Sequence, residues 1–299
     1  PIIAEDPLTF ADAVAHASIF LTSAQIRAAL IPQTVIVIGR TTLSRSINTF
    51  LRLAPTQIVI DPRMATVDSD RHADKRFTQI PELNTKTASP EWSEQWEKYA
   101  DRAAKSIDAL TGFSEAVIAR EVAANLPEGS TLFVSSSRPI RDLEGFGAPR
   151  SGVRTHANRG LAGIDGNIST ALGIASASKQ TFAVLGDLSF LHDLTGLIHR
   201  EDIDCCFIVI NNDGGGIFST LPQRGVDGFE SVFGTPHGLD PAAIAGAMGI
   251  SSSTISSIDE LKKVLKSPVK GISIVVANVA SRDENADSLK AIYESMNSI

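Results

Sequence analysis

Hydrophobic positions along the chain gather into six short runs whose length and composition predict buried strands. The runs are rich in β-branched residues and lack alternating polar positions, a pattern typical of strands covered on both faces. Segments with helical spacing of apolar residues separate them, which predicts parallel strands joined by right-handed helical crossovers. The expected fold class is therefore α/β, with doubly wound parallel sheets. The runs span residues 34–39, 57–61, 131–135, 182–186, 205–211 and 271–277.

Local signals predict where two of the helices begin. Asp240 directly precedes Pro241, which places an N-cap before a proline in the first turn. Ser257 and Glu260 have the spacing of a capping box. We expect helices to start after Asp240 and after Ser257.

A longer helix between the early and the late strands is predicted to mark a domain junction. It follows Ser89 and Pro90, and its apolar positions, Trp92 and Trp96 among them, recur at helical spacing. Large aromatic side chains at such positions usually pack a helix against a core. We therefore expect both tryptophans to pack rather than to form a binding site.

Composition and charge narrow the class of protein. At 299 residues and 43% hydrophobic content, the chain has room for two domains. A net charge of -7 disfavours a general nucleic-acid binder, which needs a clustered basic surface, but still allows a small anionic ligand. No apolar run has the length of a membrane span, and the chain does not open with a signal segment. We expect a soluble protein that binds no nucleic acid and does not span a membrane.

The cysteines and the first residues add two expectations. Cys205 and Cys206 are neighbours, so on a strand they point to opposite faces and cannot build a disulfide framework. This usage fits the reducing cytoplasm. The chain begins at Pro1 without an initiator methionine and close to an apolar segment, which predicts a fragment of a longer protein.

The candidate chemistry follows two strands that are predicted to be neighbours. Asp187 comes directly after the run 182–186, and Asn212 comes directly after the run 205–211. An acid after a strand is often only a helix cap, and Asn-Asp-Gly-Gly is often only a turn. At the carboxyl ends of adjacent parallel strands, however, carboxylate and amide oxygens together can hold Mg²⁺ and a diphosphate. We expect such a site here.

Two further features support an anion at this edge. A helix expected from Asp187 to Leu197 would direct its free N–H groups and its dipole toward the same anion. Glycines at positions 214, 215 and 216 would let the backbone approach a ligand without a clash at Cβ. The main-chain carbonyl of Gly214 is a third oxygen available to the metal.

These residues resemble the signature of the thiamine-diphosphate enzymes. Gly186-Asp187 and Asn211-Asn212 match its two ends, with Leu188 where most such enzymes have a second glycine. Longer strings are similar to one branch, the 2-succinyl-5-enolpyruvyl-6-hydroxy-3-cyclohexene-1-carboxylate synthase family of menaquinone biosynthesis. These strings cover residues 158–166, 186–194 and 217–222. The resemblance is dense from residue 131 to 222, thinner from 1 to 110 and weak after 235.

The resemblance implies a domain organisation. Residues 1–88 would be a truncated middle domain, 89–112 a linker helix and 113–299 the diphosphate-binding domain. The family's N-terminal pyrimidine-binding domain would be absent from this chain. In the family, a glutamate on that domain of a partner subunit touches the cofactor pyrimidine, so the chain alone is expected to be inactive. Family sites form between subunits, which implies a homodimer or homotetramer.

The resemblance also implies roles for individual residues. Mg²⁺ or Mn²⁺ would be bound by Asp187, Asn212 and the carbonyl of Gly214. Ile164 would hold thiamine diphosphate in its bent shape. Cofactor contacts would come from Ile164, Gly186, Leu188, Ser189, Gly214 and Ile217. Substrate contacts would come from Ser137, Arg141, Arg159, Ile217, Phe218 and Arg45, the last standing where the family shows adjacent basic residues. Among these, Ser137, Arg141, Arg159 and Ile164 would serve catalysis.

The implied reaction is the decarboxylation of 2-oxoglutarate and the addition of the succinyl carbanion to isochorismate. Both substrates are dicarboxylates, and the guanidinium fork of arginine pairs with a carboxylate through two hydrogen bonds. Arginines at 141 and 159 therefore suit this chemistry.

Two alternatives stay open from the residues alone. Another thiamine-diphosphate carboligase, such as one like acetolactate synthase, would share the metal motif without needing both arginines. The second alternative is a non-catalytic nucleotide-binding or regulatory fragment. Residues 36–40 precede a helix, as in half of a dinucleotide-binding fold, although the G-x-G-x-x-G motif of that fold is absent from the sequence.

The histidines give little evidence for a metal site. His192 is expected to pack or to support the site from one turn into its helix. His156, His199 and His237 do not have the spacing of metal ligands, so zinc chemistry is not expected.

Overall fold

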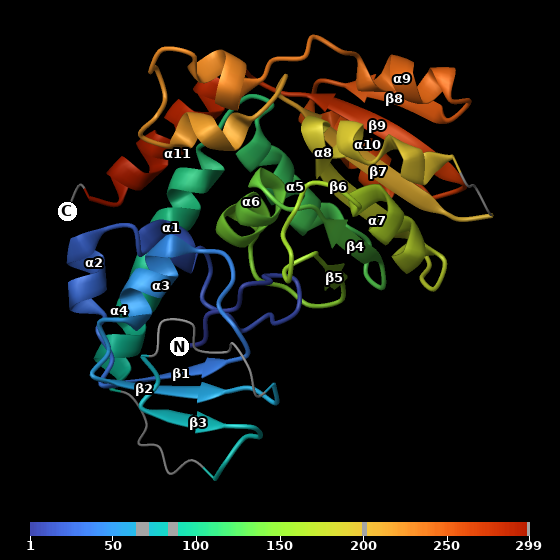
Figure 1. The fold of residues 1–299 in the computed structure, drawn as a ribbon. Helices are drawn as coiled ribbons and strands as arrows, with labels where there is room; N and C mark the ends of the chain where they lie inside the picture. Colours follow the sequence, from blue (N-terminus) through green and yellow to red (C-terminus); the bar gives the residue numbers. More distant parts are fainter. Residues whose placement is uncertain (64–71, 83–88, 199–201, 298–299) are drawn as a thin grey trace. The chain divides into compact units, whose positions relative to one another are not determined.

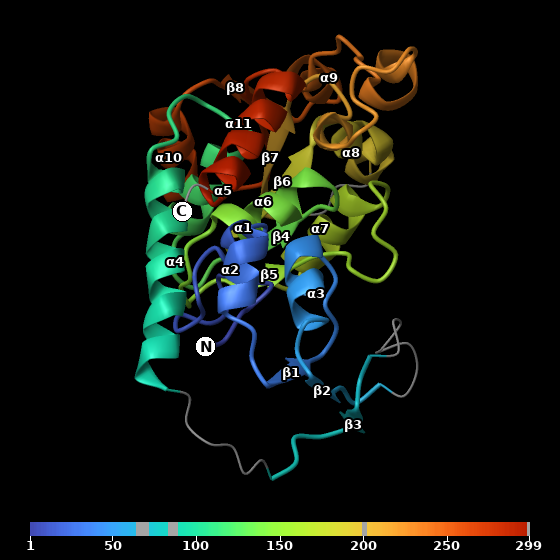
Figure 2. The ribbon, with the colours of Figure 1, turned by 90° about the vertical axis from the view of Figure 1, so that its left-hand side faces the viewer.

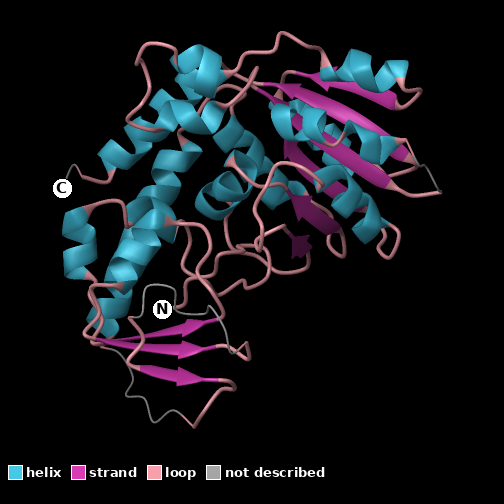
Figure 3. Cartoon of the chain, viewed as in Figure 1, coloured by secondary structure: helices cyan, strands magenta, loops and turns pink. Residues whose placement is uncertain are grey.

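The computed structural model of the chain describes residues 1–63, 72–82, 89–198 and 202–297. They form two compact units: one comprises Pro1–Glu5, Ala13–Asp108 and Ile292–Ile299, and the other Asp6–Asp12 and Ala109–Ala291. Each unit contains one sheet of parallel strands, drawn in magenta in Figure 3. The strands alternate with helices along the chain, which confirms the predicted α/β class. No helix within the described ranges has the length and apolar character needed to cross a membrane.

The first unit is built on a three-stranded sheet in the order β1-β2-β3. Its strands are β1 (Thr34–Ile38), β2 (Thr56–Ile60) and β3 (Lys75–Phe77). The prediction that β1 is buried on both faces is wrong, because β1 is an edge strand and Ile38 is 71% exposed. β3 was not predicted, since three residues of which two are cationic carry no hydrophobic signal.

Aromatic packing holds the long helix α4 (Pro90–Asp108) to the rest of the first unit. Trp96 is 3% exposed and meets the rings of Phe20 and Phe50 edge-on, with centroids 5.8 and 5.5 Å away. Trp92 packs edge-on against Trp96, so both tryptophans pack as predicted. The expected linker 89–112 thus contains a helix that clusters with the first unit, and the expected boundary at residue 88 lies outside the described residues. The other helices of this unit are α1 (Ala17–Phe20), α2 (Ala24–Ala29) and α3 (Arg45–Leu51).

The second unit is built on a six-stranded parallel sheet in the order β5-β4-β6-β7-β9-β8. The four inner strands lie within about one residue of the predicted runs. The outer strands β5 and β8 were missed, because edge strands need little apolar surface and β8 has the sequence Ser-Ser-Ser-Thr-Ile. The strands are β4 (Thr131–Val134), β5 (Arg154–His156), β6 (Thr181–Gly186), β7 (Cys205–Asn211), β8 (Ser251–Ile255) and β9 (Ile272–Asn278).

Helices cover both faces of this sheet (Figures 1 and 2). On one face, α5 (Glu115–Asn125) packs against α6 (Arg138–Phe146) and α10 (Ile258–Lys266). On the other face, α8 (Asp187–His192) packs against α7 (Asn167–Ala175) and α9 (Pro241–Ala247). The remaining elements are η1 (Leu194–Leu197), η2 (Gly216–Thr220), the π-helical turn η3 (Glu230–Gly234) and α11 (Arg282–Ser295), whose last residues belong to the first unit.

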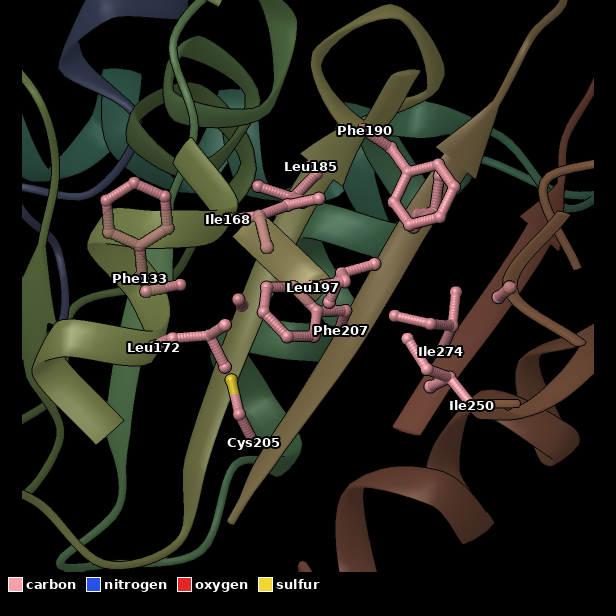
Figure 4. Packing of buried hydrophobic residues seen from close by; sticks show 14 of the residues in the cluster. Phe133, Ile168, Leu172, Leu185, Phe190, Leu197, Cys205, Phe207, Ile250 and Ile274 are labelled. Carbon is pink, nitrogen blue, oxygen red and sulfur yellow. The ribbon is translucent and has the colours of Figure 1, made fainter. Parts of the chain in front are cut away.

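A buried hydrophobic cluster joins the sheet to the α7 and α8 layer (Figure 4). Alternate residues of the strands point into it, for example Leu185 of β6 and Phe207 of β7, both fully buried. Phe190 of α8 and Ile168 of α7 meet them there. Cys205 belongs to this cluster, and both cysteines are buried and free of disulfides. The cluster fixes α8, and therefore the residue at its start, against the end of β6.

Both predicted helix starts are confirmed. The carboxylate of Asp240 accepts hydrogen bonds from the N–H groups of Ala242 and Ala243, 2.9 and 3.2 Å away. The hydroxyl of Ser257 accepts the N–H of Glu260 at 3.3 Å. These side chains satisfy the free donors of the first turns of α9 and α10.

The strand order creates a crevice between β4 and β6. After β4 the chain passes to β5 on one side of the sheet, whereas after β6 it passes to β7 on the other. The helices that follow, α6 and α8, therefore leave toward opposite faces. Ligands of open α/β sheets bind at such a point, at the carboxyl ends of the strands.

Candidate functional site

A cavity of about 310 Å³ lies at the carboxyl ends of β4, β6 and β7. Its wall is formed by the residues that follow each of these strands, together with the start of α5 and one residue before α7. Most of the site residues predicted from the sequence line it. These are Ser137, Ile164, Gly186, Asp187, Leu188, Ser189, Asn212, Gly214, Ile217 and Phe218.

Asp187 presents a buried carboxylate to this cavity. It is the first residue of α8 and is 2% exposed. Its Oδ1 accepts the N–H of Leu188 at 2.6 Å, and its Oδ2 accepts the N–H groups of Asn212 at 3.2 Å and Gly214 at 2.9 Å. Burial raises the pKa of Asp187, and these hydrogen bonds offset only part of the rise. A cation in the cavity would stabilise the charged form.

His237 lies behind Asp187 and was missed by the sequence reasoning. Its Nε2 is 3.3 Å from Oδ2 of Asp187, and its ring is largely buried. The N–H of Leu239 donates to Nδ1 at 3.0 Å, so Nδ1 acts as an acceptor. The hydrogen-bond network therefore assigns the proton of a neutral ring to Nε2, facing the carboxylate. No local motif joins two residues so far apart in the sequence.

The side chain of Asn212 is held in one orientation. Its Nδ2 donates to Oε1 of Glu115, the first residue of α5, which is 4% exposed. Its Oδ1 is buried and has no hydrogen-bond partner among the described residues. A buried amide oxygen without a partner is costly unless something else binds it. Glu115 was not predicted, and its only local signal was the N-cap Ser114 before it.

The glycine turn after β7 is shaped by a second chain segment. Gly214 has a φ of +130°, and a Cβ there would lie 2.2 Å from the carbonyl oxygen of Gly234. A Cβ on Gly215 would lie 2.2 Å from the carbonyl oxygen of Phe233. The expectation that these glycines make room for a ligand is therefore incomplete, because the backbone of Phe233 and Gly234 already excludes a side chain. The carbonyl of Gly214 accepts the N–H of Gly216 at 3.0 Å and retains a second lone pair.

The helix expected from 187 to 197 is shorter than predicted. α8 ends at His192, and the 3₁₀ helix η1 follows from Leu194. Asp193 lies at the break, where its carboxylate accepts the N–H of Ser169 at 2.7 Å. The prediction that His192 packs or supports the site is wrong, because its side chain is exposed. A six-residue helix also contributes less dipole than the expected one.

Ser189 connects α8 to the loop that carries Ile164. Its hydroxyl donates to the carbonyl of Ile164 at 2.8 Å and accepts from Nδ2 of Asn167 at 2.9 Å. The side chain of Ile164 is half-buried and lines the cavity. Ser189 thus holds the loop that positions this apolar group.

The backbone at the start of α6 is strained where it lines the cavity. Ser137 has a φ of 76°, a region that residues other than glycine seldom adopt. The guanidinium of Arg141 donates to the carbonyl of Ser137 at 2.7 Å. The pKa of Arg141 is lowered mainly by burial, and also by the positive charges of Arg159 and Arg138. Arg141 and Arg159 are half-buried and are not among the residues that line the cavity.

Arg45 belongs to the first unit. It begins α3 and is exposed. His199 lies outside the described residues.

The donor set of the cavity fits a hard divalent cation. Besides Glu115, whose Oε1 accepts from Asn212, it offers the carboxylate of Asp187, the amide oxygen of Asn212 that has no other partner, and the main-chain carbonyl of Gly214. Mg²⁺ prefers such oxygen ligands. Across residues 1–63, 72–82, 89–198 and 202–297, no group of three or more His, Cys, Asp and Glu side chains could hold a metal ion. The arrangement therefore fits Mg²⁺ with an anionic co-ligand better than a site built from histidine and cysteine.

Two family models match the chain along nearly its whole length. Residues 2–134 match the family described as "Middle domain of thiamine pyrophosphate", and residues 146–279 match "Thiamine pyrophosphate enzyme, C-terminal TPP binding domain". The chain belongs to the thiamine pyrophosphate enzymes. Thiamine pyrophosphate is another name for thiamine diphosphate. The second match contains Asp187, Asn212 and Gly214, the oxygen donors of the cavity.

Three curated relatives that match the chain share the name 2-succinyl-5-enolpyruvyl-6-hydroxy-3-cyclohexene-1-carboxylate synthase. The protein of Thermobifida fusca is 38% identical over 246 residues, which cover 78% of this chain and 44% of the relative. The protein of Lysinibacillus sphaericus is 34% identical over 295 residues, 93% of this chain and 51% of the relative. The protein of Bacillus cytotoxicus is 32% identical, covering 88% and 48%. The chain thus spans about half the length of the curated relatives that it matches.

Proposed function

We propose that the protein containing this chain uses thiamine diphosphate and Mg²⁺, or Mn²⁺ in its place, to decarboxylate 2-oxoglutarate and join the succinyl unit to isochorismate. The observation that carries the proposal is the pair formed by the buried carboxylate of Asp187 and the unpartnered Oδ1 of Asn212 at one cavity. The name shared by the curated relatives, which contains a succinyl group on a cyclohexene carboxylate, supports the choice of substrates.

The metal would be held by Asp187, Asn212 and the carbonyl of Gly214. Asp187 supplies the only full negative charge of this set. Its backbone hydrogen bonds keep both carboxylate oxygens oriented, while the metal would offset the burial that raises its pKa.

Diphosphate would bind beside the metal at the crevice between β4 and β6. Ser136, Ser137 and Arg138 line the cavity where α6 begins, and no side chain caps the first turn of this helix. Free N–H groups at a helix start favour an anion. Gly186, Leu188 and Ser189 line the opposite side, at the start of α8.

Thiamine diphosphate supplies, when bound, the electron sink that a decarboxylation of a 2-oxo acid requires. The residues of this chain position it and shield it from water. Ile164 and Ile217 are apolar groups on the cavity wall, and we assign to Ile164 the support of the bent cofactor. Phe218, which packs against Phe233 with ring centroids 5.3 Å apart, would form with Ile217 the wall of the acceptor pocket.

Arginines would recognise the substrate carboxylates. Arg141 donates to the carbonyl of Ser137, and the charge of Arg159 acts on Arg141. A guanidinium fork matches a carboxylate through two hydrogen bonds. We assign substrate contacts to Ser137, Arg141 and Arg159, and in addition to Arg45 of the first unit. A homodimer or homotetramer in the cytoplasm completes the proposal.

The test is turnover by the full-length protein. We expect consumption of 2-oxoglutarate that requires isochorismate, thiamine diphosphate and Mg²⁺ together, and little reaction with pyruvate. Turnover of pyruvate instead would point to a carboligase like acetolactate synthase. Binding of NAD without binding of thiamine diphosphate, measured by calorimetry, would overturn the proposal in favour of a nucleotide-binding protein.

A further inference from the structure

A line of largely buried polar side chains, Asn212, Glu115 and Arg138, forms part of the cavity wall. Asn212 donates through Nδ2 to Oε1 of Glu115, and Oε2 of Glu115 lies 3.5 Å from Nε of Arg138. Glu115 therefore accepts a hydrogen bond from Asn212 on one side and forms an ion pair with the guanidinium of Arg138 on the other. Its side chain is 5% exposed and that of Arg138 13% exposed, so water does little to screen either interaction.

The chemistry of Glu115 decides which end of the Asn212 amide faces the cavity. An ionised carboxylate accepts hydrogen bonds but cannot donate one, whereas an amide has one accepting and one donating end. Only the NH₂ end of Asn212 can therefore satisfy Glu115. Oδ1 is left to face the metal position, and it is this atom that lacks a partner.

Glu115 is itself fixed in place. It begins α5, whose first turn is capped by Ser114, and its own N–H donates to Oδ1 of Asn285 at 3.0 Å. Arg138 is bound on its other side by Asp142. Rotation of the Glu115 side chain away from Asn212 would leave a buried carboxylate and a buried amide group unsatisfied.

We propose that Glu115 is a positioning residue that selects the metal-binding orientation of Asn212. The inference rests on the proposed function, since it assumes that Oδ1 of Asn212 binds the divalent cation. Outer partners of metal ligands act in this way, by orienting the ligand rather than by touching the ion.

The decisive variant is Glu115→Gln. A glutamine has one accepting and one donating end, but both neighbours of position 115 are donors. The cationic Arg138 would take the carbonyl end, because hydrogen bonds with an ionised partner are the stronger ones. The NH₂ end would then face Asn212 and turn its Oδ1 away from the metal position. We expect affinity for Mg²⁺, titrated calorimetrically in the presence of thiamine diphosphate, to fall by about 10- to 100-fold.

A second substitution should reverse this loss. Asn212→Asp alone places two carboxylates against each other and should weaken Mg²⁺ binding, since like charges this close disfavour each other's ionisation. In the Glu115→Gln background the same aspartate can accept from the glutamine NH₂ and keep one oxygen for the metal. We therefore expect Asn212→Asp to lower the affinity for Mg²⁺ when Glu115 is present. In the Glu115→Gln background, the same substitution should raise the affinity for Mg²⁺.

Glu121→Gln is the matched control. Glu121 lies on the same helix, is also buried and pairs with Arg120 and Lys262 away from the cavity. It should leave Mg²⁺ affinity at the wild-type value. Mn²⁺ binding followed by electron paramagnetic resonance gives a second readout that needs no turnover.

The outcomes separate the inference from the proposed function. Wild-type protein that binds Mg²⁺ and thiamine diphosphate, with unchanged affinity in Glu115→Gln, overturns the inference alone. An unfolded Glu115→Gln protein that Asn212→Asp does not restore overturns it as well, because Glu115 would then be purely structural. Wild-type protein without Mg²⁺-dependent cofactor binding refutes the proposed function, and this inference with it.

Discussion

His237 and Asp187 form a pair behind the candidate metal position, with Nε2 of the imidazole 3.3 Å from Oδ2 of the carboxylate. Asp213 fixes the backbone of His237, because its Oδ1 accepts the N–H groups of His237 at 3.0 Å and Gly238 at 2.8 Å. The pair therefore connects the end of β6 to the segment that follows η3. His237 supports the buried carboxylate without being among the residues that line the cavity.

Replacing His237 by leucine should weaken the metal site without removing any ligand. The substitution takes away the N–H that faces Oδ2 of Asp187, so the buried carboxylate is less well oriented. Mg²⁺ affinity measured by calorimetry should fall by about 10- to 100-fold, as is typical for the loss of a partner of a metal ligand. His156→Leu, in the edge strand β5, serves as the control. Equal affinities of the two variants would contradict the role of His237.

Replacing Asp187 by alanine should abolish Mg²⁺-dependent binding of thiamine diphosphate. The variant loses the only charged oxygen among the three proposed ligands, and neutral amide and carbonyl oxygens bind Mg²⁺ weakly without it. Asp204→Asn is a suitable control, because Asp204 accepts the N–H of Gly271 beside the amino end of β7. Cofactor affinity that is unchanged in Asp187→Ala and still requires Mg²⁺ would exclude this residue as a ligand.

A methyl group at position 214 should be poorly tolerated. Gly214→Ala brings a Cβ within 2.2 Å of the carbonyl oxygen of Gly234 and forces alanine to a φ of +130°. We expect a loss of about 1–3 kcal/mol in the free energy of unfolding, together with weaker cofactor binding. Gly173→Ala is the matched control on α7, where a Cβ meets nothing within 4 Å. It should stabilise the protein by about 0.5–1 kcal/mol, and equal urea midpoints for both variants would contradict the prediction.

The stability of the protein should depend on pH through Asp142. This residue of α6 is 1% exposed, and burial raises its pKa from 3.8 to about 7 although Arg138 contacts one of its oxygens. The charge of Glu115 also raises this pKa, and Oδ2 of Asp142 has no hydrogen-bond partner among the described residues. A carboxyl whose folded pKa exceeds its unfolded pKa favours folding at low pH, and this stabilisation is lost as pH rises through about 7.

Asp142→Asn removes this dependence, since its side chain does not titrate. Urea denaturation at about pH 5 and about pH 8 should show the wild type losing stability relative to the variant as pH rises. Parallel behaviour of the two proteins would mean that Arg138 keeps Asp142 ionised throughout this range.

The inner strands could be predicted from the sequence because a strand that is buried on both faces consists of an uninterrupted run of apolar residues. β7 (Cys205–Asn211) was predicted to the residue. The edge strands contain no such apolar run, since β5 is Arg-Thr-His and β8 is mostly serine. α8 was predicted too long, because nothing local to Asp193 indicates that its carboxylate binds the N–H of Ser169 on α7.

In the candidate site, too, the residues that could be predicted are those marked by their neighbours in the sequence. Asp187 and Asn212 could be chosen from the sequence because each directly follows an apolar run. Glu115 and His237 could not, because their importance depends on which residues the fold brings next to them. An acidic residue in the first turn of a helix ordinarily only stabilises that helix, so Glu115 carried no sign of its contact with Asn212.

The hydrogen bond from the N–H of Gly215 to the carbonyl of Gly234, 2.8 Å long, closes the intervening chain into a loop with two fixed ends. Within residues 219–229 the side chains of Ser219 and Phe229 are buried, and Phe229 packs against Phe233, so these two also help to hold the loop. Ile217 and Phe218, at the entrance of the loop, already line the cavity. Substitutions confined to the exposed positions of this loop would therefore change the surface next to Ile217 and Phe218 without altering Asp187, Asn212 or Gly214.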